Sequence, residues 1–317
     1  MTDESGAILS WLIENRARIA PCPETLEAWW ASVRAPTARW REPVDRALAR
    51  AFLADRVAYA FAAGYQAALR RLVPSLPDDR VVSLCVTEEK GNHPRAIETR
   101  LDRDPAGVSR ITGRKRWATH SPHAMELLVV ARSGERPDGR PRLELVRVLG
   151  GAPGVAIEPM HGVAFVPEIS HGTVTLDAVP VADDDVLPGD GYDDYVKPFR
   201  TIEDVHVAAA LVGHLIRSAL AFGWPASITE DLLAFVAAAR ELALADPKAL
   251  ATHLALGGLF REQARILAAI EPCWALADDA TRARWKRDAA LLGVAGAARE
   301  KRLEAARASL TAERASR

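Results

Sequence analysis

The sequence predicts an α+β protein in which a helical segment, a β segment and a second helical segment follow one another. Apolar residues recur with helical spacing before residue 79 and again after residue 201. Between these stretches, short alternating or wholly apolar runs are separated by glycine and proline, which is typical of strands. A chain of 317 residues that is 49% hydrophobic can bury more than one core. We therefore predict three domains, at residues 1–79, 80–197 and 198–317.

The N-terminal segment carries apolar side chains at helical spacing, as Ile8, Leu12 and Ile19 do. Prolines interrupt this pattern, because proline removes a backbone donor and clashes with the preceding turn. Helices are expected over residues 7–20, 24–33 and 44–72.

The middle segment is expected to form a compact antiparallel sandwich or barrel, because several short strands follow one another at close spacing. Turn residues such as Pro137, Asp138 and Gly139 separate the runs. Strands are expected at 81–86, 96–101, 127–130, 143–148 and 172–177.

The C-terminal segment is expected to form a bundle of four helices. The first covers 203–220, and Ser227 or Thr229 can cap a second that runs to residue 245. Asp246 and Pro247 are typical of a helix start and predict a third helix to about residue 270. Asp279 is expected to cap the last helix, which continues to about residue 310.

Composition excludes several classes of protein. A formal net charge of −1 does not create the one-signed field of a nucleic-acid-binding protein. The first ten residues lack the pattern of a secretory signal, and no window is expected to reach the roughly 18 apolar residues of a membrane span. Cys22, Cys85 and Cys273 lie far apart, which indicates reduced thiols in a cytoplasmic protein. His120 and His123 have no third ligand nearby, so no metal site is expected.

Four segments in the same order carry a resemblance to a known family. They are CVTE at 85–88, GRKRWAT at 113–119, GTVTLDAVPVADDDVLPGDG at 172–191 and EDVHVAAALVG at 203–213. On these segments the chain resembles the acyl-CoA dehydrogenases, as a shortened and partly degenerate member. The resemblance implies an N-terminal helical domain, a middle antiparallel β-barrel or sandwich domain and a C-terminal helical bundle.

The same resemblance implies a reaction and its partners. Acyl-CoA dehydrogenases use FAD to remove hydrogen from the α and β carbons of an acyl-CoA thioester: a carboxylate takes the α-proton, and the flavin accepts the β-hydrogen as hydride. It also implies an electron-transfer partner and assembly as a homo-oligomer, or as a hetero-oligomer with a related subunit.

The resemblance also assigns cofactor-binding residues. It places Trp117 near the flavin, with the Thr119 hydroxyl and the Ala118 backbone at the flavin edge. It likewise implies that Val86 and Thr87 meet the flavin where their strand ends. Strand alternation independently puts Trp117 and Thr119 on one face, and the neighbouring Lys115 and Arg116 are expected to be exposed hairpin charges.

The base is expected at Glu203, at the start of the first C-terminal helix. The alternative is that Glu203 only complements the helix dipole in the first turn. Asp204 follows where the family has arginine, and a second carboxylate there would raise the pKa of Glu203 if the two approach. His93 replaces the family's serine that meets the cofactor or the thioester, which makes it a candidate substrate-binding residue.

Three departures from the family pattern favour a second hypothesis. The family's glycine-rich loop reads EKGNHP at 89–94, Asp204 stands where the family has arginine, and Ala219 stands where an arginine usually holds the flavin diphosphate. The alternative is a catalytically silent relative that serves as the non-flavin subunit of a heteromer or as a binding module.

Overall fold

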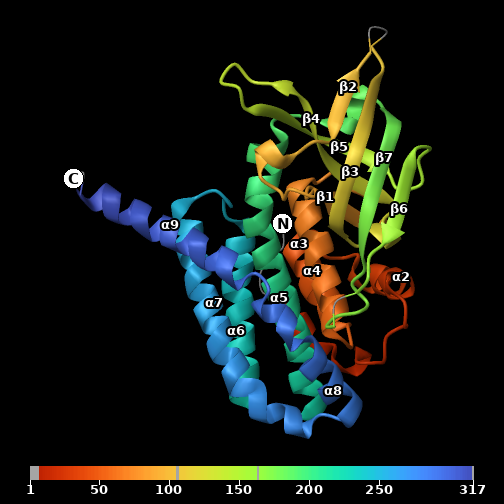
Figure 1. Cartoon of the computed structure of the whole chain (residues 1–317). Helices are drawn as coiled ribbons and strands as arrows, with labels where there is room; N and C mark the ends of the chain where they lie inside the picture. Colours follow the sequence, from red (N-terminus) through yellow and green to blue (C-terminus); the bar gives the residue numbers. More distant parts are fainter. Residues whose placement is uncertain (1–6, 105–106, 163, 316–317) are drawn as a thin grey trace. The chain divides into compact units, whose positions relative to one another are not determined.

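The computed structural model describes residues 7–104, 107–162 and 164–315 and divides the chain into two compact units. Unit 1 contains Met1–Pro74, Ala164–Val166 and Thr201–Arg317, and unit 2 contains Ser75–Val163 and Pro167–Arg200. The N-terminal and C-terminal helices therefore belong to one unit, and the strands belong to the other (Figure 1). The three-domain division by sequence stays a prediction.

Four helices open unit 1, in the region where the sequence predicts helix. Thr25 caps the second of them by accepting a hydrogen bond from the Ala28 N–H at 3.3 Å, and Pro43 starts the third. Stacking of Trp29 on Tyr59, with ring centroids 4.7 Å apart, joins the second helix to the fourth. The helices are α1 (Ala7–Glu14), α2 (Leu26–Thr37), α3 (Pro43–Phe52) and α4 (Val57–Leu72).

The C-terminal helices differ from the expected ones in their ends. Helix α5 starts at Lys197 rather than Glu203, directly after a π-helical turn at Gly191–Val196. The residue before α6 is Pro225, without a side-chain cap, so the expected caps Ser227 and Thr229 lie inside the helix. The helices are α5 (Lys197–Phe222), α6 (Ala226–Leu244), α7 (Leu250–Ile270), α8 (Asp279–Asp288) and α9 (Gly296–Ala315).

Two further helices begin at residues other than the expected ones. Asp246 does not cap α7. It accepts a hydrogen bond from the Lys248 N–H at 2.8 Å, which forms a turn before α7. Asp278, not Asp279, caps α8 by accepting from the Thr281 N–H at 2.8 Å. A short 3-10 segment, Ala289–Gly293, separates α8 from α9 where one long helix was expected.

The strands of unit 2 form one sheet, which is mixed rather than wholly antiparallel. Its order within the described ranges is β6-β7-β3-β2-β4-β5-β8, and β1 also pairs with β4. Both β1 and β2 run parallel to β4, while the other pairs are antiparallel. The strands are β1 (Val82–Cys85), β2 (Arg100–Arg103), β3 (Ser109–Thr119), β4 (Glu126–Glu135), β5 (Pro141–Leu149), β6 (Val155–Pro159), β7 (His171–Val181) and β8 (Val186–Leu187).

The position of β4 inside the sheet explains why its sequence is apolar on both faces. Its residues 126–131 are all buried, and it is flanked by β5, β1 and β2. One core cluster combines inward residues of β3, β4, β5 and β7, among them Ile111, Val129, Val146 and Val174. The expected strand at 96–101 begins later, at Arg100, because Pro94 starts a 3-10 turn over Pro94–Ala96.

One helical stretch, Gly191–Phe222, is long and apolar enough to span a membrane by length and composition, contrary to expectation. Of its most apolar window, 83% is buried inside the structure. A core helix passes the same test, so this stretch is weak evidence for a membrane span.

Candidate functional site

Two segments of unit 2 bring the predicted cofactor residues together. Val86 and Thr87 follow the last residue of β1, and Trp117, Ala118 and Thr119 are the last residues of β3. We call these five residues the Trp117 site.

Hydrogen bonds join the two halves of the Trp117 site. The Arg116 N–H donates to the Thr87 carbonyl at 3.0 Å, and the Ser83 hydroxyl donates to the Thr119 carbonyl at 2.7 Å. The end of β1 is therefore fixed beside the end of β3, although Arg116 and Thr87 are 29 positions apart along the chain.

A β-bulge exposes the Trp117 side chain on the surface of unit 2. The pairing of β3 with β7 shifts between Lys115 and Ala118, and Trp117 adopts a φ of 54° within the bulge. Lys115 and Ala118 are both buried, whereas the Trp117 side chain is 50% exposed. The bulge interrupts the simple alternation expected from sequence, but Trp117 and the partly exposed Thr119 flank the buried Ala118.

The Arg116 side chain covers one face of the indole. Its guanidinium carbon lies 4.2 Å from the centroid of the Trp117 ring, and the guanidinium forms an ion pair with Glu89. Arg116 was expected to be a freely exposed charge, and it instead links the loop after β1 to the indole.

Lys115 was also expected to be exposed, and this prediction was wrong. Its side chain is fully buried, and its Nζ lies 2.6 Å from Glu88 Oε1 and 3.2 Å from the Val86 carbonyl oxygen. Glu88 additionally accepts the backbone N–H of Glu98 at 2.7 Å and that of Thr99 at 3.0 Å. The pair fixes the loop from residue 88 to residue 99 behind the Trp117 site.

The electrostatics of this pair favour an ionised carboxylate. Burial by itself raises the pKa of Glu88, but the Lys115 ammonium and the two backbone N–H groups outweigh it, so the pKa lies below its usual value. The sequence shows Lys115 in GRKRWAT and Glu88 at the end of CVTE. It does not show that they pair, because their pairing depends on the strand register.

The structure explains why the first residue of GRKRWAT, Gly113, is a glycine. A Cβ at Gly113 would lie 2.6 Å from the Thr99 Cα and 2.3 Å from its Oγ1. Only glycine allows this close approach between β3 and the segment that starts β2.

His93, the predicted substrate-binding residue, lies on the loop after the Glu88 pair. Its side chain is exposed, and its Nδ1 accepts a hydrogen bond from the Arg95 N–H at 3.3 Å. In this structure the ring therefore caps the 3-10 turn at Pro94–Ala96.

Glu203, the predicted base, belongs to unit 1. It is half-buried and lies almost two turns inside α5. The helix dipole acts within the first turn, so the alternative reading of Glu203 as a dipole partner does not apply. Asp204 is bound by Arg299, at 2.8 Å, and by Arg302.

The position where the family's arginine would hold the flavin diphosphate lies in α5. Ala219 is buried there, and Arg217, two residues earlier, donates to the Ala20 carbonyl at 2.9 Å.

Sequence comparison finds neither a protein-family model nor a curated protein that matches the chain. Structural comparison gives a clear result. The chain superposes on butyryl-CoA dehydrogenase from Megasphaera elsdenii with a TM-score of 0.67, covering 98% of this chain and 99% of that one, at 12% identity. The chain has the acyl-CoA dehydrogenase fold.

Two other solved structures share this acyl-CoA dehydrogenase fold. A glutaryl-CoA dehydrogenase from Mycobacterium smegmatis, in complex with FADH2, gives a TM-score of 0.60 at 13% identity, covering 93% of this chain and 91% of that one. PigA with FAD and proline gives 0.61 at 11% identity, covering 93% and 94%. At these identities the likeness defines the fold, and the predicted order of helical, β and helical segments is confirmed.

Proposed function

We propose that the protein is an FAD-dependent acyl-CoA dehydrogenase that oxidises the α and β carbons of an acyl-CoA thioester. The half-exposed indole of Trp117, on a β-bulge beside the end of β1, carries this proposal. A soluble domain gains little stability from an exposed indole in a strained backbone conformation. A flat aromatic ligand supplies a reason for both features.

The polar groups around the indole suit a flavin edge. The hydroxyls of Thr87 and Thr119 have no hydrogen-bond partner among the described residues, so both are available to a ligand. In the proposal Trp117 forms the wall against the ring system, and Val86, Thr87, Ala118 and Thr119 hold its edge. Several solved structures with this fold are FAD complexes, which supports FAD as the group bound.

Glu203 is the proposed base, which takes the α-proton of the thioester. FAD, when bound, accepts the hydride. Glu203 is half-buried inside α5, and glutamate is one of the side chains that serve as a general base. Asp204 is neutralised by Arg299 and Arg302, so it is not available as a second base.

His93 is the proposed contact for the substrate, since its exposed ring lies on the loop that follows CVTE. The proposal includes an electron-transfer partner that reoxidises the flavin, and assembly as a homo-oligomer or with a related subunit. It places the protein in the cytoplasm, in keeping with three cysteines that are all free thiols.

Absorbance of the purified protein tests this function. We expect a yellow protein with the flavin spectrum, and bleaching when an acyl-CoA is added anaerobically. Glu203→Gln should keep the colour and slow bleaching by at least a hundredfold, since general base catalysis contributes about 10²–10⁴-fold. Glu230→Gln, a matched change at an exposed position of α6, should bleach at the normal rate. Normal bleaching in Glu203→Gln would remove Glu203 from the proposal.

A catalytically silent subunit is the second candidate, and the flavin diphosphate end favours it. Ala219 cannot bind a phosphate, and Arg217 is bound to the Ala20 carbonyl. A colourless protein that stays colourless after incubation with FAD would select this candidate over the enzyme.

A further inference from the structure

A groove lies between α6 and α7 in unit 1, apart from every residue of the Trp117 site. The two helices lie side by side (Figure 1), and the groove has a volume of about 510 Å³. The side chains of Phe235 and Leu259 are buried beneath it. Its remaining apolar lining is mostly small, and the alanines are exposed, so no described segment covers them: Ala234, Ala238, Ala255 and Gly258.

Some of the charges beside the groove are neutralised within the chain. Asp231 of α6 lies 3.0 Å from Arg265 of α7, and Arg265 also pairs with Glu262 at 2.5 Å. Two others have no ion-pair partner within the described ranges, Glu241 on α6 and Arg261 on α7. We call the groove, together with Arg261 beside it, the α6–α7 face.

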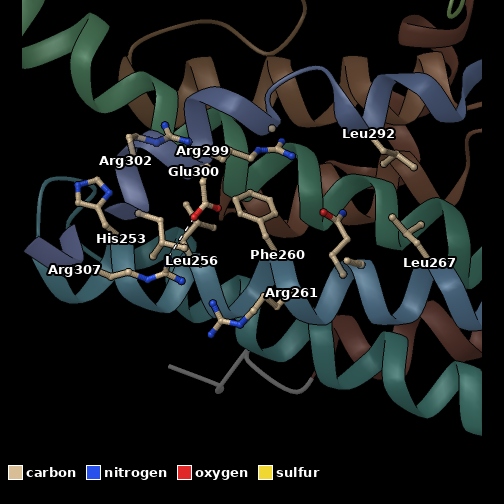
Figure 2. A pocket seen from close by; sticks show the side chains of 15 residues that line it. His253, Leu256, Phe260, Arg261, Leu267, Leu292, Arg299, Glu300, Arg302 and Arg307 are labelled. Atoms are coloured by element: carbon tan, nitrogen blue, oxygen red, sulfur yellow. Dashed lines mark hydrogen bonds and ion pairs between the residues drawn. The ribbon is translucent and has the colours of Figure 1, made fainter. Parts of the chain in front are cut away.

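The Arg261 side chain lies against the groove. One of its guanidinium nitrogens is the nearest atom, at 3.8 Å, to the place that a Cβ on Gly258 would take. Figure 2 shows the pocket between α7 and α9, where Arg299 and Arg302 share the carboxylate of Asp204, and the Arg261 guanidinium points away from both. Arg261 is therefore a free cation on the side of α7 that faces α6.

The ion pair between Asp231 and Arg265 shows how the two helices are aligned. It joins the first part of α6 to the last part of α7, so the helices run antiparallel. Four residues back along α7 from Arg265, Arg261 stands at the level of Phe235. Glu241 lies six residues further along α6, which is about 9 Å at the rise of an α-helix.

Ala238 and Gly258 stand midway between the levels of Glu241 and Arg261. A two-fold axis that crosses both helices there would bring Glu241 of each copy to the level of Arg261 of the other. In such a dimer every contact occurs twice, because the same face serves both copies. The small residues lie at the axis, where two helix pairs must approach most closely.

We propose that the α6–α7 face binds the same face of a second copy of the chain, with Glu241 of each copy paired with Arg261 of the other. The contact removes the exposed alanines from water. The two ion pairs fix the register of the copies, since complementary charges mainly provide specificity. The inference rests on the homo-oligomer of the proposed function and names its contact face, and it does not depend on the flavin chemistry.

Light scattering of the full chain over a range of concentrations tests the proposal. We expect the mass of at least two chains. Glu241→Arg would set two guanidinium groups opposite each other, and symmetry repeats this repulsion. The dissociation constant should rise about tenfold for each of the two contacts and about a hundredfold in all. At a concentration where the natural chain is just assembled, the mass should fall to half.

Reversing both charges makes the test specific. Arg261→Glu alone should also halve the mass, whereas a chain with both Glu241→Arg and Arg261→Glu should regain it, because each pair is restored with opposite signs. Glu14→Arg, the same charge change at the exposed end of α1, should leave the mass unchanged. The melting temperature of each variant shows that it folds.

Three outcomes would contradict the proposal in different ways. A natural chain with the mass of one chain would overturn the contact and the homo-oligomer together, and would leave a different protein as the partner of this face. Unchanged mass in both single variants would overturn the α6–α7 face but not the homo-oligomer. Failure of the double variant to regain the mass would overturn the pairing of Glu241 with Arg261. The flavin absorbance of the natural chain tests the enzyme separately.

Discussion

Lys115 shows how one buried charge can determine local order. Its ammonium has no exposure to water, and Glu88 Oε1 at 2.6 Å is its acidic partner. Lys115→Met would leave the Glu88 carboxylate buried without a counter-charge. We expect the free energy of unfolding to fall by about 3–5 kcal/mol, the usual loss when one partner of a buried pair is removed. Denaturant unfolding measures the change.

Two further variants make this test specific. Adding Glu88→Leu to Lys115→Met removes both charges and should restore part of the lost stability. Lys90→Met breaks the exposed pair that Lys90 forms with Glu98 and should change stability little. Equal losses in Lys115→Met and Lys90→Met would show that burial of the pair is irrelevant.

We expect Trp117 to contribute to ligand binding although its backbone conformation is unfavourable. Its φ of 54° suits glycine or asparagine better than tryptophan, and the indole is half-exposed. Trp117→Asn should therefore keep or raise the free energy of unfolding by up to about 1 kcal/mol. The same variant should bind FAD at least tenfold more weakly, as followed by flavin absorbance.

Trp117→Phe is the control, because it keeps an aromatic face and should keep most of the bound flavin. If Trp117→Asn binds FAD as tightly as the natural chain, the indole is not the wall of the flavin site. If its stability falls sharply instead, Trp117 has a structural role in the bulge.

At the scale of elements, the crossing of α4 and α5 depends on one glycine. A Cβ at Gly64 would lie 2.6 Å from the Val207 Cα and 2.9 Å from the His206 carbonyl oxygen, and backbone cannot yield cheaply. Gly64→Ala should lower the free energy of unfolding by about 1–3 kcal/mol through overpacking, despite the better helix propensity of alanine.

Gly258 in α7 offers the matched change. The nearest atom to its Cβ would be an Arg261 guanidinium nitrogen at 3.8 Å, so the site has room. Gly258→Ala should raise the free energy of unfolding by up to about 1 kcal/mol. Thermal unfolding compares the two variants, and a gain of stability in Gly64→Ala would contradict the close crossing.

The sequence predicted the kind of each element better than its ends. Helical periodicity identified the regions of α2, α4, α5 and α7, because the burial of one helical face is encoded locally. The start of α5 was missed, since Lys197 to Ile202 has no distinct capping residue. The parallel pairing of β1 with β4 was missed because it joins Val82 to Glu126, and pairing at that separation leaves no local signal.

The sequence predicted that the segments around Thr87 and Trp117 lie together, but it did not predict which residues hold them in place. The motif residues around Thr87 and Trp117 do lie together, as the resemblance implied. The bulge at Trp117 and the burial of Lys115 could not be read from sequence, because both depend on the register of β3 with β7 and on the fold of residues 88–99. Whether these residues bind FAD stays a prediction.

At the scale of the whole molecule, buried histidines are expected to make stability depend on mildly acidic pH. Burial lowers the pKa of His120 to about 3 and the pKa values of His206 and His214 to about 4, from an ordinary value of 6.5. His120 belongs to unit 2, while His206 and His214 belong to unit 1. Both units therefore contain a histidine that folding keeps neutral.

The direction of this pH dependence follows from proton binding in the folded and unfolded states. Below pH 6.5 the unfolded chain takes up a proton at each of these histidines, while the folded chain stays neutral there until about pH 4. The stability is therefore complete above pH 6.5 and is lost as the pH falls towards the folded pKa values. With 1.36 kcal/mol per proton and pH unit, three histidines imply a loss on the order of 5 kcal/mol between pH 7 and pH 5.

Denaturant unfolding at pH 7, 6 and 5 measures this loss, in a range where ordinary carboxylates stay ionised. His206→Asn keeps an N–H that can donate to the Ile202 carbonyl, which His206 Nδ1 contacts at 2.8 Å, but cannot be protonated. It should reduce the loss between pH 7 and pH 5 by roughly 2 kcal/mol, whatever its effect at pH 7. His161→Asn, at an exposed position, should leave the pH dependence unchanged. An unchanged pH dependence in His206→Asn would mean that His206 is not held neutral in the folded protein.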